Sequence, residues 1–261
     1  MHGLILAGFS NTCYDDNHAL SLAGFMNLNN GYASHWQIAG GVNASRKKAR
    51  GLQLAGIANI NADTLHGSQI AGVLNVARRT VGLQIGLINV ADSVTKGSFG
   101  FLSFVRKGVH QLEISTNETF AYNAVLRTGS HKFYTALYAG MQPYSGASAI
   151  QYYGYGIGYN VKLSKKSNLN LDLSSHQLVR DFNFNSYNPY ARFDVTYEYF
   201  IGKKIAITAG PSIAALGNSL STWNTVPSYE AVLPNINTYQ QNIGNYNYTY
   251  WFGAKAGIRF F

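Results

Sequence analysis

Acidic and basic side chains recur at alternate positions in segments that the sequence predicts as strands. In residues 191–201, Arg192, Asp194 and Glu198 alternate with apolar and aromatic residues. Because successive side chains of a strand point to opposite faces of the sheet, these three share one face. The charged residues expected on such polar faces are Glu113, Asp172, Arg192, Asp194, Glu198, Lys255 and Arg259.

Amide side chains form a second polar set, in the N-terminal part of the chain. Its members are Gln37, Gln53, Gln69, Gln84, Asn43, Asn59 and Asn75. If both sets face a common lumen, they would form a polar wall of mixed charge that selects solutes. The alternative is that the charges pair with one another and make the interior rigid, while the amides satisfy one another.

Residues suited to catalysis or metal binding do not cluster in the sequence. The seven histidines are scattered, and the chain contains no H-E-x-x-H, C-x-x-C or G-x-S-x-G motif. We therefore expect no catalytic residues, no metal site, no cofactor and no enzyme activity. A hydrolase built from Ser174 and His176 is a remote alternative, because it rests only on two residues that share a strand face.

The elements that must position these side chains begin with an internal repeat over residues 3–96. A unit of about sixteen residues occurs six times, with copies such as LQLAGIAN and SQIAGVLN. Within a copy, apolar residues such as Leu52 and Leu54 alternate with Gln53 and Asn59, which predicts β-structure. The sixth copy is one residue short at Gly86.

Two architectures fit the repeat: each copy is one strand of an antiparallel barrel, or one coil of a β-solenoid. Basic turns such as SRKKAR and ARRT follow every second predicted strand, with the acidic first turn CYDDNHA as the exception, and the turns between them carry few basic residues. Alternate turns lie at opposite ends of an antiparallel barrel, so this pattern favours the barrel. Further strands are predicted at 98–105, 110–115, 120–127, 133–141, 151–163, 168–177, 191–201, 205–214 and 249–261.

The predicted fold is all-β: a single antiparallel up-and-down transmembrane β-barrel of about 14–16 strands. It would span residues 1–261, with the repeats at 3–96 supplying strands within it. The alternative is an N-terminal β-solenoid followed by a smaller C-terminal barrel.

The composition agrees with a membrane barrel. Only 12% of the residues are charged, while Tyr (19) and Phe (14) are abundant, and no apolar run approaches the roughly 20 residues of a membrane helix. The formal net charge is +9. We expect no nucleic-acid partner, because the basic turns lack the interleaved aromatic residues of a binding platform. They are better suited to lipid phosphates.

Two resemblances point to the same class. The last segment, YTYWFGAKAGIRFF, resembles the aromatic-terminated final strand of bacterial outer-membrane barrels. The repeats GLQLAGIANINA, GSQIAGVLNVA and GLQIGLINVA resemble those of uncharacterised surface-repeat barrel proteins of the Bacteroidota. The resemblance implies the bacterial outer membrane as the location, with the lipid bilayer and lipopolysaccharide as partners. It implies no activity.

The leading functional hypothesis is a porin-like channel for small polar solutes. The alternative is a non-conducting surface or scaffold barrel that docks a partner protein in an outer-membrane complex. Residues 217–247 form a long predicted loop, and Trp223, Tyr229 and Tyr239 are its candidates for a lid or a docking element.

Overall fold

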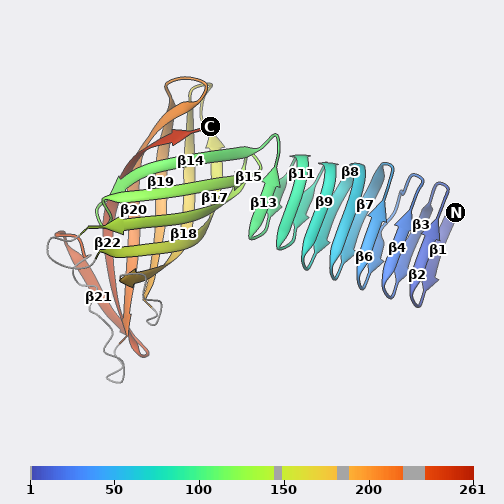
Figure 1. The fold of residues 1–261 in the computed structure, drawn as a ribbon, viewed down its shortest axis with the longest axis horizontal. Helices are drawn as coiled ribbons and strands as arrows, with labels where there is room; N and C mark the ends of the chain where they lie inside the picture. Colours follow the sequence, from blue (N-terminus) through green and yellow to red (C-terminus); the bar gives the residue numbers. More distant parts are fainter. Residues whose placement is uncertain (1, 144–148, 181–187, 220–232) are drawn as a thin grey trace. The chain divides into compact units, whose positions relative to one another are not determined.

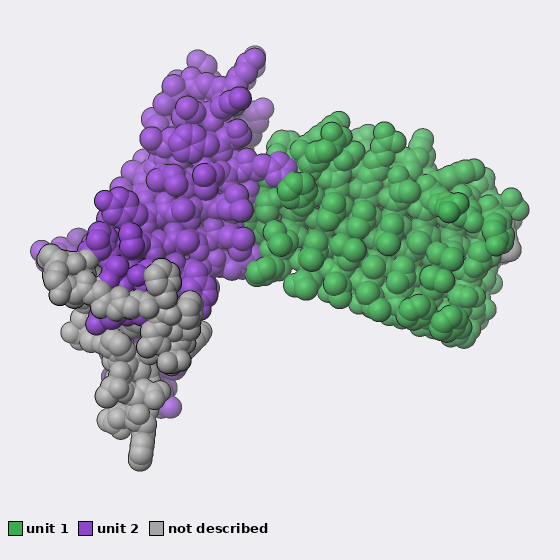
Figure 2. Space-filling view, in the orientation of Figure 1, with its two compact units in different colours: residues 1–109, 128–135 green, residues 110–127, 136–261 purple. Residues whose placement is uncertain are grey.

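The computed structural model describes residues 2–143, 149–180, 188–219 and 233–261. Every regular element in these ranges is a β-strand. No helix in them is long and apolar enough to cross a membrane. The chain divides into two compact units, coloured in Figure 2: residues 1–109 with 128–135, and residues 110–127 with 136–261.

Unit 1 is a parallel β-solenoid, whose strands follow one another side by side in Figure 1. One row of strands contains β1 (His2–Ala7), β3 (His18–Ala23), β5 (Gln37–Ala39), β7 (Ala49–Ala55), β10 (Leu83–Ile85) and β12 (Gly97–Phe99). The other contains β2 (Ser10–Cys13), β4 (Met26–Asn29), β6 (Val42–Ser45), β9 (Leu74–Thr80), β11 (Ile88–Val94) and β13 (Leu102–Val105). The long β8 (Ala58–Ala71) runs through both rows, since it pairs with β6 and β9 and also with β7 and β10.

Each repeat is therefore one coil that bends at its Ala-Gly pair. Parallel pairing places equivalent residues of successive coils side by side, so that Asn43 lies next to Asn59 and Gln37 next to Gln53. The bend places residues of the corner, such as Ile57 and Val73, on the surface. Strict alternation along a straight strand would place Phe9, Phe25, Ile57 and Val73 on the inward face with the amides, and that expectation is wrong because of the bend.

The prediction of one barrel of 14–16 strands is thus wrong for the repeat region, and the solenoid alternative is correct there. The turn charges that favoured a barrel have another cause. All turns of a solenoid lie at one edge, where neighbouring strands are about 4.8 Å apart, so equal charges in successive coils would repel. Alternating signs avoid this repulsion, and Arg106 Nε lies 2.8 Å from Asp92 Oδ1 of the preceding coil. That hydrogen bond lowers the pKa of Asp92.

Unit 2 is built on an antiparallel barrel of eight strands. They are β14 (Val109–Asn117), β15 (Tyr122–Gly129), β16 (Phe133–Gln142), β17 (Ile150–Lys162), β18 (Ser167–Arg180), β19 (Pro189–Phe200), β20 (Ile205–Ser219) and β22 (Tyr246–Phe260). The barrel closes where β14 pairs with the second half of β22, with Glu113 opposite Arg259. The first half of β22 pairs instead with the additional strand β21 (Thr238–Ile243). An up-and-down barrel is confirmed for this part of the chain.

The turn at 128–135, between β15 and β16, belongs to unit 1. Thr128 Oγ1 donates a hydrogen bond to the Ser103 carbonyl at 2.9 Å, and the rings of Phe99 and Phe133 lie 4.6 Å apart. The turn therefore covers the last coil of the solenoid, which would otherwise end in unpaired strand edges.

Candidate functional site

The barrel interior holds a cluster of buried ion pairs centred on Glu113 of β14. Glu113 Oε2 accepts from Arg127 Nη1 at 2.8 Å and from Arg259 Nη2 at 2.6 Å. Glu113 Oε1 lies 2.6 Å from Lys255 Nζ. These four side chains come from β14, β15 and β22, and their inward position follows from strand alternation. One carboxylate thus joins three cations.

Two further carboxylates balance this charge. Arg127 Nη2 lies 3.1 Å from Asp172 Oδ2 of β18, and Arg259 Nη1 lies 2.7 Å from Glu198 Oε1 of β19. Among the described residues, eight side chains of Asp, Glu, Lys and Arg are buried, four of them acidic and four basic. A balanced and paired set avoids the large cost of burying an isolated charge.

A second network surrounds Arg192 of β19. Its guanidinium donates to four side chains, at distances of 2.7 to 2.9 Å: Glu118, Tyr190, Asp194 and Ser212. Glu118 also accepts from Trp251 Nε1 at 2.9 Å. These contacts join β19, β20 and β22 to the turn between β14 and β15, so the network ties together opposite parts of the barrel wall.

Large apolar side chains fill the part of the interior beyond these networks. The buried cluster consists of Phe120, Val125, Ala136, Tyr138, Ile150, Tyr152, Leu178, Tyr190, Ala214, Leu216 and Trp251. The rings of Phe120 and Tyr152 lie 4.6 Å apart, and Tyr190 stacks on Trp251. A barrel of about eight strands has an interior just wide enough for side chains to fill.

Ser174 and His176 do meet inside the barrel. His176 Nε2 lies 2.9 Å from Ser174 Oγ. His176 Nδ1, the atom that an acid would orient in a catalytic triad, has no hydrogen-bond partner among the described residues. Both side chains are buried, and the rings of Tyr138 and Tyr152 pack against the histidine. This geometry favours packing over hydrolysis.

The charged candidates and the amide candidates lie in different units. The seven charged candidates, Glu113, Asp172, Arg192, Asp194, Glu198, Lys255 and Arg259, are all buried in the barrel. The amides, Gln37, Gln53, Gln69, Gln84, Asn43, Asn59 and Asn75, are all buried inside the solenoid. The expectation of one lumen shared by both sets is therefore wrong. Tyr239 is exposed on β21, while Trp223 and Tyr229 lie outside the described residues.

The amides form two ladders through the solenoid. Asn43 Nδ2 donates to Asn59 Oδ1 at 2.9 Å, and Gln53 Nε2 donates to Gln37 Oε1 at 2.7 Å. Each asparagine also bonds the backbone, as Asn59 Nδ2 does with the Ile70 carbonyl at 2.8 Å. The amides thus bond one another and the strand backbone, although Gln37 Nε2 and Gln84 Oε1, at the two ends of the glutamine ladder, have no hydrogen-bond partner among the described residues.

The list of charged candidates lacks two charged residues of the barrel networks. Arg127 ends the predicted strand 120–127, and it is fully buried between Glu113 and Asp172. The available signal was its alternation with Asn123 and Val125, which are buried on the same strand. Glu118 lies in a turn, where no periodicity predicts its direction.

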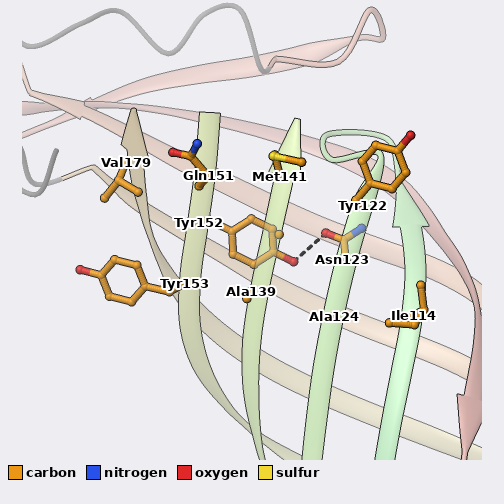
Figure 3. Close-up of a pocket in the computed structure, with 11 residues that line it drawn as sticks. Ile114, Tyr122, Asn123, Ala124, Ala139, Met141, Gln151, Tyr152, Tyr153 and Val179 are labelled. Carbon is orange, nitrogen blue, oxygen red and sulfur yellow. Dashed lines mark hydrogen bonds between the residues drawn. The ribbon is translucent and has the colours of Figure 1, made fainter. Parts of the chain in front are cut away.

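The outer wall of the barrel is apolar. Its exposed side chains include Leu112, Ile114, Leu126, Ile157, Leu173, Phe193, Tyr197, Ile207, Ile213, Phe252 and Ile258. A pocket of about 640 Å³ on this wall is lined by Tyr122, Met141 and Tyr153, which are drawn in Figure 3. Ala124 and Ala139 also line it, and their small side chains leave the hollow between the larger ones.

Comparison with known proteins gives no assignment: no family model matches the chain, and no curated protein or solved structure matches it either.

Proposed function

We propose that this protein is an integral β-barrel protein of a bacterial outer membrane whose barrel is closed to solutes. In this proposal the barrel is an anchor and scaffold that holds the solenoid and docks a partner protein. The observation that carries the proposal is the filled interior, where four acidic and four basic side chains are buried together with a layer of aromatic residues. A channel needs a continuous polar path, and these side chains occupy the space where it would run.

The outer wall supports a membrane location. Soluble monomers rarely expose apolar patches larger than a few hundred Å², whereas here apolar side chains cover strands around the barrel, with Phe252 78% exposed. The described strands β17 to β20 have 12 to 15 residues, which exceeds the roughly 9–11 residues that a tilted strand needs to cross a bilayer. Lipid chains would also fill the hollow beside Tyr153.

The exposed strand β21 gives the scaffold a docking element. All six of its residues are exposed, including Tyr239. Exposed aromatic side chains are enriched where proteins bind one another. A partner held by this strand should separate from a Tyr239→Ala variant during purification in mild detergent.

A solute-efflux assay tests whether the barrel is closed. The purified protein is reconstituted into vesicles loaded with a small sugar, and insertion is first verified by heat-dependent gel migration. We expect the efflux to equal that of empty vesicles. A matched variant, Arg192→Ala with Trp251→Ala, removes two bulky interior side chains and should leak if it inserts. Rapid sugar efflux through the unaltered protein would instead support the porin-like channel.

A further inference from the structure

The solenoid is polar inside and apolar outside, which is the reverse of a soluble protein. Its interior contains the buried amides Gln53 and Asn59, whereas the outward-facing Leu54 and Ile60 on the same two rows of strands are exposed. Buried polar groups are normally the exception, and exposed apolar surface is normally limited. Successive coils share this arrangement because each copy of the repeat has amides at the inward positions and apolar residues at the outward positions.

The apolar surface covers three sides of the solenoid. Both rows of strands present Leu, Ile and Val side chains outward, and the corner between them presents Phe25, Ile57, Val73, Leu87 and Phe101. All ionisable Asp, Lys and Arg side chains of residues 1–109 lie at the opposite edge, nine basic against four acidic. The fourth side is therefore charged and predominantly basic.

Backbone N–H groups at the apolar corner donate to carbonyls of the preceding coil. In the fourth coil the N–H of Gly56 donates to the Ala39 carbonyl, and the N–H groups of Ile57 and Ala58 both donate to the Gly41 carbonyl. The carbonyl of Leu54, which precedes the corner, accepts from the Asn43 side chain at 2.7 Å. Backbone groups that enter hydrocarbon must be satisfied within the protein, and these groups are.

The height of the apolar sides fits half of a bilayer. The apolar side of the fourth coil consists of five residues, Leu52 to Gly56, which lie between Arg50-Gly51 at the basic edge and Ile57 at the corner. At about 3.3 Å per residue they extend about 16 Å. The hydrocarbon core of a bilayer is about 30 Å thick, so one leaflet measures about 15 Å.

We propose that the solenoid lies edge-on in one leaflet of a lipid bilayer, with its Ala-Gly corner toward the bilayer centre and its basic edge among anionic lipid phosphates. Lipid is the occupant that fits, because acyl chains can cover three apolar sides at once. A second copy docked on one row of strands would leave the other row and the corner exposed to water. The basic edge complements phosphate, and each Lys or Arg near an anionic surface contributes about 1 kcal/mol.

Depth-dependent fluorescence quenching tests this placement in the full chain. Cys13 is the only cysteine, so Cys13→Ser provides a background for single cysteines labelled with an environment-sensitive dye. The probe positions are Ile57→Cys at the corner, Lys47→Cys at the basic edge and Ile157→Cys on the outer wall of the barrel. The vesicles contain phosphatidylcholine and phosphatidylglycerol, with nitroxide quenchers either at the headgroup or deep on the acyl chain.

The proposal predicts strong quenching of the label at residue 57 by the deep nitroxide, and of the label at residue 47 by the headgroup nitroxide. A label at residue 57 that aqueous iodide quenches and deep nitroxide does not would overturn it. The label at residue 157 reports separately on the barrel, so failure of the outer-membrane proposal is distinguishable from failure of the leaflet proposal. The leaflet proposal would also be overturned if the protein formed concentration-dependent dimers in which neither iodide nor the deep nitroxide quenched the label at residue 57. That result would indicate self-association through the apolar surface.

Discussion

Replacing Glu113 by glutamine should destabilise the barrel more than any other change of a single charge. The carboxylate contacts Arg127, Lys255 and Arg259 at 2.6 to 2.8 Å, and all four side chains are buried. Glutamine leaves one uncompensated positive charge and turns an NH₂ donor toward a cation. Removing one partner of a buried ion pair costs about 3–5 kcal/mol, and we expect a loss of that size.

A compensating substitution separates the effect of charge from that of shape. Lys255→Met removes one cation, so the double variant Glu113→Gln, Lys255→Met again has equal numbers of acidic and basic groups in the cluster. We expect it to recover about 1–3 kcal/mol of the loss, which is the usual range of coupling between contacting residues. Asp92→Asn is the matched control, because it makes the same change in the exposed pair with Arg106.

The assay is denaturant unfolding of the protein in lipid vesicles, with Trp36→Phe and Trp223→Phe in every variant so that the fluorescence reports on Trp251 in the barrel core. The Asp92→Asn variant should unfold at the same denaturant concentration as the unaltered protein. The reasoning is refuted if Glu113→Gln behaves like this control, or if adding Lys255→Met deepens the loss.

Two substitutions in the solenoid have matched controls at its first coil. Asn59→Ala removes a ladder amide, which orphans the buried amide oxygen of Asn75 and removes the hydrogen bonds to the Gln53 and Ile70 carbonyls. At about 1–3 kcal/mol for each unsatisfied group, we expect a cost of about 2–6 kcal/mol. Asn11→Ala should cost less, because that side chain is only partly buried. Hydrogen exchange of the coils measures the stability that each variant loses. Equal losses of stability would contradict the ladder account. Gly56→Ala should disrupt its coil, because a β-carbon there would clash with the Gly40 carbonyl oxygen, whereas Gly8 has open space. Limited proteolysis should therefore cleave the Gly56→Ala variant within the repeats and spare Gly8→Ala, and equal resistance would show that the corners are not tightly packed.

Strand alternation was predictable because it depends only on the local chain. Every strand of the closed barrel corresponds to a segment predicted between residues 110 and 261, and each amide candidate faces an interior as expected. The partner of each strand was not predictable in this way, since parallel coils and antiparallel hairpins show the same alternation.

One spacing in the sequence does discriminate between the two architectures. Gln84 and Asn89 are five residues apart, so on a straight strand they would point to opposite faces. Both are buried, because the coil bends at Gly86 between them. The short sixth copy therefore indicates a corner.

The networks of the site were partly predictable. Alternation identified Arg192 and Arg259 as inward-facing, but it gives no distances, so it could not distinguish a polar wall from a paired core. The decisive quantity is the number of strands that close the barrel. Because the repeats form a separate solenoid, the barrel is closed by eight strands. The interior of a barrel of about eight strands is filled by side chains and leaves no water-filled lumen.

Single-channel recording in a planar bilayer tests the closed-barrel proposal most directly. The protein is fused into the bilayer from vesicles in which its insertion has been verified, and current is recorded across a range of voltages. The account predicts a silent bilayer for the unaltered protein and current steps for the Arg192→Ala, Trp251→Ala variant. Steady current steps from the unaltered protein, with an ion selectivity that Glu113→Gln changes, would contradict it.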